Sequence, residues 1–506
     1  MQLLRFFTTE RRLPLIIFTG LYRVMWKKKK YWFWLLCMLA YSYFLSAQSI
    51  ISENAIPNPD NENFFNNSTA PFVVKNIVIT GNKKTKPVII LRELPFKTGD
   101  QFLLQELVKK FEQAREQLMN TALFHEVVVA LKSFEGHDVD VLIEVKERWY
   151  IFPIPYFKPI DRNFNQWLVE QKASLDRLNY GIKLLYNNVT GRNDKLRFWL
   201  LDGYDRQISF EYDRLYIDKS LKWGMDVKFS LGKSKEVNYN TINDKQAFIR
   251  DNDNYLRNFL NANVEITYRR AIKTRHRFGF GYNIENVNDT IISLNPSYFT
   301  SGRHFIRYPE LYYSMTFFDV DYIPYPTKGY AAEFTFSKKG FNNVMNVWQL
   351  SLKGLANWHL FPRTYLNIET FTSLKFPFKQ PYFNRPMLGY SDVFIQGYEY
   401  YVIDGVAGGY LKTTFTRELF NFQGNFLRKK REEPLHIPVR IFAKIYGNVG
   451  YVHNPQPGEN SLNNKMLCSG GFGIDILTFY DLTLKLEWTF NQLGQNGVFL
   501  QRTSYF

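Results

Sequence analysis

Cysteine and histidine are scarce in this chain of 506 residues, and their scarcity excludes several kinds of site. Two cysteines, Cys37 and Cys468, cannot make a disulfide framework. The seven histidines are dispersed, and none stands at metal-ligand spacing from another, so we expect no metal. A mean hydropathy of −0.30 excludes a bundle of membrane helices. Because no phosphate loop, nucleophile elbow or outstanding carboxylate pair occurs, we predict neither an enzyme nor a cofactor.

Aromatic residues are abundant. They make up 18% of the chain, with 46 Phe and 33 Tyr, a balance typical of transmembrane barrels with aromatic girdles. The formal net charge is +17, which suits contact with anionic lipid head groups or nucleic acid. The Lys and Arg residues are scattered along strand-like segments rather than clustered. We therefore expect lipid contact and no nucleic-acid binding.

The first residues have the pattern of an export signal. Lys27–Lys30 precede an apolar run, Tyr31–Leu45, that is too short to cross a bilayer comfortably as a helix. The pattern predicts a signal peptide over residues 1–47, with Met25 as an alternative start and an uncleaved anchor as the alternative reading. Residues 48–71, rich in Asn, Pro and Asp, are predicted to be a linker.

Residues 72–147 predict a small α+β domain. Alternation predicts an opening strand that stops at Gly81, and apolar positions on one face predict a long helix after Gly99. The predicted order is β-α-α-β-β, which leaves sheet edges exposed. Its elements are strand Val73–Thr80, a short helix opened by Pro87 and running through Leu94, a longer helix, and strands Glu126–Leu131 and Val139–Val145.

From residue 148 to residue 506 the hydrophobic period is two. Tyr180, Ile182 and Leu184 alternate with Gly181 and Lys183, and similar runs recur to the end of the chain. One face of each run is apolar and the other carries Lys, Glu and Gln, as in a barrel with a wet interior and a lipid-facing exterior. These 359 residues (506 − 147) suffice for about sixteen strands, with fourteen or eighteen as alternatives.

Asp392–Tyr410 interrupts this alternation. The stretch is rich in Tyr and Gly, has few charges and shows no helical period. Such a composition favours a compact loop whose backbone presses against another surface. We predict a loop folded inward against the barrel wall; an ordinary surface loop is the alternative.

These features together resemble a known family. Asn120–Phe124, the break between the second helix and the second strand, and the turn Thr80-Gly81-Asn82 resemble the polypeptide-transport-associated (POTRA) domain. Asn188–Asp194 and Asp321–Gly329 resemble the first hairpin and the mid-barrel turn of the outer-membrane assembly-factor superfamily. That superfamily includes BamA, TamA and two-partner-secretion transporters. The resemblance implies a single POTRA domain that accepts client strands at its sheet edge, or that serves only as a spacer.

The resemblance also assigns roles within the predicted loop and barrel. Ile395, Gln396, Gly397, Tyr398 and Glu399 occupy the family's inward-loop motif, in which Arg stands where this chain has Gln396. The matching wall residues are Tyr446, Asn448 and Gly450, with Asn448 where the family has an acid. We predict that a neutral Gln396–Asn448 amide pair replaces the family's ion pair.

Two further roles concern the ends of the barrel. Tyr505 and Phe506 resemble the terminal assembly signal of outer-membrane barrels. Tyr180, Gly181 and Ile182 are predicted to lie on the first strand, which in the family meets the last strand at a seam that can open sideways.

The function implied is an outer-membrane insertase or translocase of a Gram-negative cell, with the POTRA domain in the periplasm. Its partners would be unfolded outer-membrane or secreted client polypeptides and outer-membrane lipids, with accessory lipoproteins as an open question. The alternatives are a passive or gated pore and a secretion channel for one dedicated partner.

Overall fold

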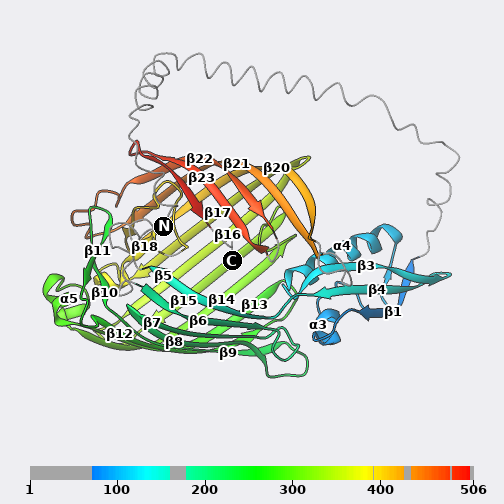
Figure 1. Ribbon diagram of the computed structural model, residues 1–506, viewed down its shortest axis with the longest axis horizontal. Helices are drawn as coiled ribbons and strands as arrows, with labels where there is room; N and C mark the ends of the chain where they lie inside the picture. The colour runs from blue at the N-terminus through cyan, green and yellow to red at the C-terminus, as the bar shows by residue number, and fades with distance from the viewer. Residues whose placement is uncertain (1–70, 160–177, 391, 427–434, 479–480, 502–506) are drawn as a thin grey trace, which may run out of the picture. The chain divides into compact units, whose positions relative to one another are not determined.

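The computed structural model describes residues 71–159, 178–390, 392–426, 435–478 and 481–501 (Figure 1). The predicted signal peptide, all of the predicted linker except Pro71, and the terminal Tyr505 and Phe506 lie outside the described residues. Within the described ranges, no helix is long and apolar enough to cross a membrane, a finding that does not bear on strands.

The N-terminal domain has the predicted β-α-α-β-β order with one short strand added. Its four-stranded sheet has the order β2-β1-β4-β3. The two-residue β2 was not predicted because two residues cannot display a period. The buried core includes Val74, Ile89, Leu107, Leu118 and Ile143. The elements are β1 (Phe72–Thr80), α3 (Pro87–Leu91), β2 (Gln101–Phe102), α4 (Leu104–Asn120), β3 (Phe124–Glu135) and β4 (Asp138–Glu147).

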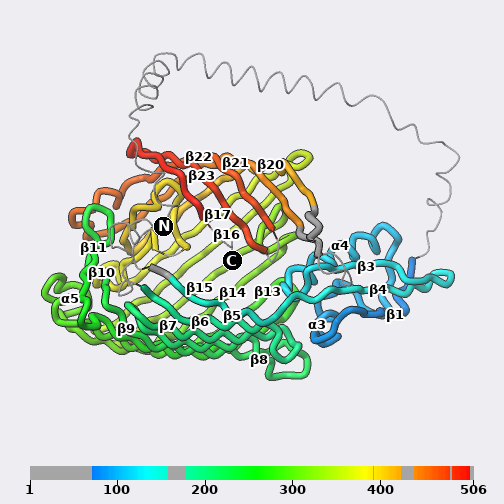
Figure 2. The backbone as a smooth tube through the Cα atoms, viewed as in Figure 1, coloured from blue at the N-terminus to red at the C-terminus, as the bar shows by residue number. Residues whose placement is uncertain are grey.

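A 16-stranded antiparallel sheet forms the rest of the protein and confirms the predicted barrel and its strand number. Figure 2 follows the chain from the cyan N-terminal strands of the barrel through green and yellow to the red C-terminal strands. The first eight strands in chain order are β5 (Ile151–Pro159), β6 (Leu178–Asn187), β7 (Lys195–Gly203), β8 (Asp205–Tyr216), β9 (Trp223–Ser234), β12 (Arg257–Tyr268), β13 (Thr274–Val287) and β14 (Phe305–Val320). The other eight are β15 (Gly329–Lys339), β16 (Val347–Phe361), β17 (Thr364–Phe376), β20 (Ala407–Phe426), β21 (Leu435–His453), β22 (Met466–Leu477), β23 (Thr483–Asn491) and β24 (Asn496–Gln501).

The two faces of the barrel wall are opposite to those of a water-soluble protein. In β21, Lys444, Tyr446 and Asn448 are buried, whereas the intervening Ile445 is 61% and Val449 40% exposed. The polar face therefore points inward and the apolar face outward, as expected of a wall that meets lipid. The burial pattern confirms that Asn448 shares the inner face with Lys444 and Tyr446.

The strand predicted to come first is in fact the second strand of the sheet. Tyr180, Gly181 and Ile182 lie in β6, which is paired on one side with β7 and on the other with β5. The edge strand is β5, and the Asn188–Asp194 hairpin joins the second and third strands. The sequence of β5, Ile-Phe-Pro-Ile-Pro-Tyr-Phe-Lys-Pro, lacks an alternation of polar and apolar residues. The hydrophobic period therefore did not predict a strand there.

Smaller elements gather beyond the strand ends, opposite the turns that contact the N-terminal domain. Asp244, in the turn between β10 and β11, accepts backbone bonds from Ser461 and Leu462 at 3.0 Å, and its carbonyl accepts the N–H of Val402 at 2.9 Å. These bonds tie three loops together. The elements are β10 (Glu236–Ile242), β11 (Lys245–Arg250), α5 (Asp289–Leu294), η4 (Thr300–Gly302), η5 (Tyr382–Asn384), β18 (Pro386–Leu388) and β19 (Ile403–Asp404).

Candidate functional site

The predicted loop lies against the inner wall of the barrel. Ile395 and Tyr398 are each only 2% exposed. A Cβ at Gly450 would clash with Ile395 Cδ1, so the missing side chain in β21 makes room for the loop. The Tyr398 hydroxyl donates to the Cys468 carbonyl of β22 at 3.1 Å. The inward-loop prediction is correct, and Gly450 is one of its contacts.

Gly397 is required at the centre of this contact. Its φ is +92°, a conformation that side-chain-bearing residues avoid, and an added Cβ would lie 2.9 Å from Ser469 Cβ. The Gly397 carbonyl accepts a bond from Asn491 Nδ2 at 2.7 Å. The loop backbone is therefore held directly against β22 and the end of β23.

The predicted Gln396–Asn448 pair is wrong. Gln396 Nε2 donates instead to Glu487 Oε1 of β23 at 3.3 Å, and Asn448 Nδ2 donates to Ser469 Oγ at 3.2 Å. The partner of Gln396 is thus the acidic residue Glu487, which lies two strands away from the expected partner, Asn448 of β21. Alternation in Leu484–Trp488 already put Glu487 on the inner face; what the sequence did not reveal was its register against the loop.

Glu487 belongs to a buried charged cluster. Lys444 Nζ lies 2.6 Å from both Asp475 Oδ1 and Glu487 Oε1, and all three residues are at most 6% exposed. Tyr325, within the mid-barrel turn, donates to Asp475 Oδ2 at 2.9 Å. One cation and two carboxylates leave a formal excess of one negative charge, which the Gln396 amide meets as a neutral donor. We call Gln396, Lys444, Asp475 and Glu487 the loop lock.

The loop also reaches the last strand. Gln501 Nε2 donates to Glu399 Oε1 at 3.4 Å, and the Tyr400 and Phe499 rings lie 5.3 Å apart. Glu399 in turn accepts the Gly397 N–H at 2.8 Å. Movement of the loop is therefore linked to the position of β24.

The sheet has two edges, β5 and β24, and no pairing joins them within 151–159 and 496–501. The Asn187 N–H donates to the Tyr150 carbonyl at 2.8 Å, which fixes the phase of the β5–β6 ladder. In that phase, five residues of β5 direct their backbone toward the outer edge: Ile151, Pro153, Pro155, Phe157 and Pro159. Proline has no N–H, so three of these five positions cannot donate. We call the β5 and β24 edges the seam.

The β24 side of the seam differs. Asn491 N–H donates to the Gln495 carbonyl at 3.1 Å, so Asn496, Val498 and Leu500 direct their backbone outward. Each of these has both an N–H and a carbonyl. The two edges of the seam therefore differ: three of the five outward positions of β5 lack a donor, whereas those of β24 all have one.

The N-terminal domain has a free edge of its own. Strand β3 is the outermost strand of its sheet and is paired only with β4. It is 12 residues long, and Val128, Leu131 and Phe134 are 41%, 43% and 71% exposed. A long, exposed apolar edge is a template for another strand.

Residues 72–148 match the POTRA family, described as a surface antigen variable number repeat. They form a POTRA domain. The predicted fold class, a barrel of about sixteen strands preceded by a small α+β domain of POTRA type, is therefore confirmed. No curated protein matches the chain.

Solved structures of low sequence identity also resemble the chain. BamA from Haemophilus ducreyi lacking POTRA domains 1–3 is 12% identical, with a TM-score of 0.44, over 85% of this chain and 83% of that one. CdiB from Acinetobacter baumannii is 12% identical, with a TM-score of 0.44, over 84% and 71%. CdiB from Escherichia coli is 11% identical, with a TM-score of 0.48, over 86% and 74%. Likenesses at this level are no evidence of a shared function.

The POTRA domain contacts several turns at one end of the barrel. Lys86 N–H donates to the Gly191 carbonyl at 2.9 Å, and Arg148 binds Asp481 with bonds of 2.5 and 3.0 Å. Asn120, at the end of α4, accepts the Ile323 N–H at 2.9 Å and donates to the Val320 carbonyl at 3.0 Å. The predicted motif residue Asn120 is thus part of the joint between domain and barrel.

Another contact is a buried ion pair. Glu93 is 3% exposed and accepts two bonds of 2.6 Å from Arg269, just after β12. Burial alone would raise the pKa of Glu93, but the bonds and charge of Arg269, with Arg92, lower it to about 2. The carboxylate is therefore ionised throughout the neutral range.

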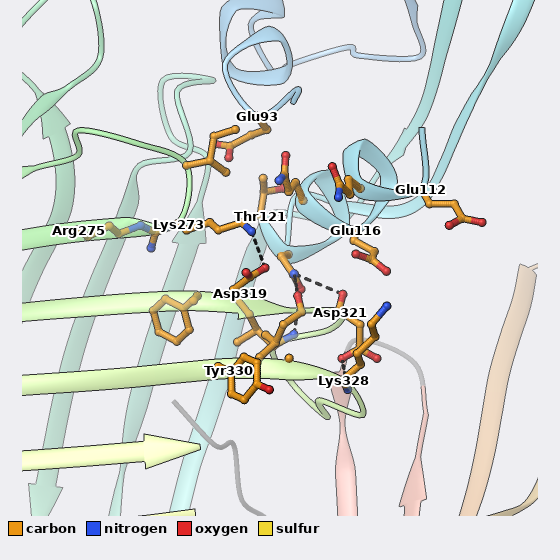
Figure 3. A pocket seen from close by; sticks show the side chains of 18 of the residues that line it. Glu93, Glu112, Glu116, Thr121, Lys273, Arg275, Asp319, Asp321, Lys328 and Tyr330 are labelled. Atoms are coloured by element: carbon orange, nitrogen blue, oxygen red, sulfur yellow. Dashed lines mark hydrogen bonds and ion pairs between the residues drawn. The ribbon is translucent and has the colours of Figure 1, made fainter. Parts of the chain in front are cut away.

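A cavity of about 550 Å³ lies beside this joint (Figure 3). Glu116 of α4 points toward the barrel turn that carries Asp321 and Lys328, whereas the carboxylate of Glu112 points away from the barrel. Lys273 and Asp319 form an ion pair of 2.6 Å. Burial and the nearby Asp321 carboxylate raise the pKa of Glu116. Five acids and five bases line the cavity, so its charges balance. Among the described residues, no group of His, Cys, Asp or Glu could hold a metal.

Proposed function

We propose that this protein is an outer-membrane insertase or translocase, which passes client polypeptides from the POTRA domain to the seam of the barrel. The proposal assigns it no catalytic step and no cofactor. The POTRA domain would lie in the periplasm, where unfolded clients arrive.

The observation that carries the proposal is the asymmetry of the seam. In lipid, an unpaired backbone group costs several kcal/mol. The β5 edge cannot form a full ladder with β24, because three of its five outward positions, Pro153, Pro155 and Pro159, lack a donor. A seam that closes incompletely is one that a client strand can enter.

The same asymmetry favours β24 as the templating edge. Asn496, Val498 and Leu500 offer alternating donors and acceptors to an incoming strand, whereas β5 offers mainly acceptors. A client would pair first with β24 and meet β5 last. The loop contacts Glu399–Gln501 and Tyr400–Phe499 would then report the arrival of a client to the inward loop.

Capture would begin at β3. Its exposed edge can add an extended segment through backbone bonds, a mode of binding that needs little sequence specificity. Release would be driven by the client's own folding, since a closed ladder in lipid satisfies the groups that an unfolded chain leaves unpaired. No nucleotide is needed for such a transfer.

Depletion of the protein, followed by quantification of folded barrels and surface proteins in the outer membrane, tests the proposal. Broad loss of folded barrels is the expected result, and loss of one or two species would indicate a dedicated transporter. An unchanged outer-membrane proteome with altered permeability to small solutes would contradict the insertase and favour the pore.

A further inference from the structure

A second cavity, of about 250 Å³, lies in the inner wall near the POTRA domain and is strongly basic. Eight basic and three acidic side chains line it, from β7, β8, β9, β12, β13 and the adjoining turns, with Arg92 from the POTRA domain. It differs in this respect from the charge-balanced cavity of Figure 3, although Arg269 and Arg275 line both. We call it the arginine cavity.

The carboxylates around the arginine cavity already have partners within the protein. Each of them lies within 4 Å of a cation that it neutralises or is bonded to a backbone N–H. Arg197 pairs with Glu211 (2.8 Å) and Asp213 (2.9 Å), Lys228 with Glu211 (3.4 Å) and Glu265 (3.1 Å), and Arg92 and Arg269 with Glu93 (3.0 and 2.6 Å).

Three arginines of the cavity form no ion pair with a carboxylate. Within the described part of the chain, Arg214, Arg275 and Arg277 form no ion pair, although all three line the cavity. Asp226, the remaining acid, accepts the backbone N–H of Arg214 at 2.6 Å rather than its guanidinium. Arg275 lies close enough to Arg214 and Arg269 for their charges to repel one another. Cations crowded in a wall of low dielectric constant destabilise the fold unless an anion joins them.

The backbone of β8 is distorted at this point. The β8–β9 register shifts between Tyr212 and Leu215, and Arg214 within the shift has a φ of +63°. This left-handed region is disfavoured for a residue with a long side chain. The bulge nevertheless adds a cation to a wall that already has an excess of them. Bulges that re-aim a side chain in this way are concentrated at functional sites.

We propose that the arginine cavity binds a phosphate-type oxyanion, held by the guanidinium groups of Arg214, Arg275 and Arg277. Guanidinium is planar and always charged, and its forked donors match the oxygens of a phosphate group. The group could be free inorganic phosphate or the phosphate of a lipid head group. Because Arg92 lines the cavity, occupancy also stabilises the contact between the POTRA domain and the barrel. This inference does not rest on the insertase proposal.

The test is a thermal melt of the full chain in uncharged detergent, titrated with sodium phosphate and, separately, with sodium chloride at equal ionic strength. Phosphate is expected to raise the melting temperature saturably and beyond the effect of chloride. Arg275→Gln is expected to weaken the apparent phosphate affinity at least about tenfold, which corresponds to ~1.4 kcal/mol. The exposed Arg303→Gln removes the same charge elsewhere and is expected to leave the affinity unchanged.

The unliganded variants provide a second readout. Without phosphate, Arg275→Gln should melt at or above the wild-type temperature, because it relieves repulsion. Arg214→Asn should do the same, since Asn tolerates a positive φ. A lower melting temperature for both variants would show that the arginines hold the wall together by themselves, and would overturn the proposal.

The source of the group is distinguished in nanodiscs. A response to inorganic phosphate supports a free anion, and a response confined to phosphatidic acid mixed into phosphatidylcholine supports a lipid head group. Equal gains from phosphate and chloride, or no gain from either phosphate source, would contradict the site.

Discussion

The loop lock and the arginine cavity lie on the same inner wall but differ in charge balance. In the loop lock, Lys444 lies between Asp475 and Glu487, and the inward loop bonds to Glu487 through Gln396. In the arginine cavity, Arg214, Arg275 and Arg277 form no ion pair among the described residues, and a space of about 250 Å³ lies between their strands. The first region matches and buries its charges, whereas the second collects charge of one sign around a space.

The difference distinguishes charges that stabilise the fold by themselves from charges that need a ligand. A buried pair that loses one partner is costly, so a matched cluster fixes the position of whatever covers it. An unmatched cluster stabilises only when a ligand completes it. The following four changes test this comparison and the seam that lies between the two regions, from the largest expected effect to the smallest.

Lys444→Met should have the largest effect. It leaves Asp475 and Glu487 buried without their cation, at a cost of about 3–5 kcal/mol. We expect the folded band on unheated SDS gels to disappear at a markedly lower temperature. Lys379→Met, at an exposed loop position, is the control. Equal stability of the two variants would show that the lock does not hold the wall.

Glu93→Gln should release the POTRA domain from the turn after β12. With a pKa lowered from 4.5 to about 2, the ionised Glu93 favours the docked state by about 3 kcal/mol. This contribution is complete above about pH 4.5 and is lost as the pH falls toward 2. Distances between spin labels on the POTRA domain and the barrel should broaden in Glu93→Gln at neutral pH.

The pH dependence of the spin-label distances provides a control for Glu93→Gln. Wild type should undock as the pH is lowered through this range, whereas Glu93→Gln should show no such transition from this group. Glu112→Gln, on the exposed side of α4, should behave as wild type. Identical distance distributions for Glu93→Gln and wild type at pH 7 would refute the assigned role of the ion pair.

Replacing Pro153 and Pro155 by Ala should tighten the seam. Two restored N–H donors can each bond to β24, worth about 1–3 kcal/mol together. We expect a barrel that resists heat better and inserts clients more slowly. Pro309→Ala, in β14 and far from the seam, is the matched control. Faster insertion by the double variant would mean that the prolines hinder clients rather than admit them.

Gln396→Arg and Gln396→Glu should change the loop lock in opposite directions. The lock carries one excess negative charge, so Arg should strengthen loop docking and Glu should weaken it, each by about 1 kcal/mol. Protease sensitivity of the loop and the melting temperature measure both effects. Equal protease sensitivity and equal melting temperatures of the two variants would show that the side chain at position 396 does not interact with the charge of Glu487.

Much of this architecture could be predicted from the sequence because it depends on periodicity. Alternation over long runs predicted sixteen strands, and the break in alternation at Asp392–Tyr410 predicted the inward loop. Strand β5 was missed because Pro153 and Pro155 obscure its pattern. Glu487 was missed because its contact with Gln396 spans 91 residues, and the register of such a contact is invisible in sequence.

The arginine cavity shows the same limit most clearly. Its basic residues are dispersed from Arg92 to Arg277, and dispersion along the chain was taken as absence of a cluster. The inference against nucleic acid stays a prediction, but its premise was incomplete. Strands that pair in a barrel bring scattered charges together on one wall, and only the fold reveals which ones meet.

Site-specific photo-cross-linking at Val498 tests the central claim most directly. Val498 directs its backbone to the seam and its side chain, 61% exposed, to the outer face. Leu486, on the same face but one strand in from the edge, is the control. A photoreactive residue at 498 should capture the terminal strand of a client during insertion, and one at 486 should not. Clients that insert normally without an adduct at 498 would contradict the account.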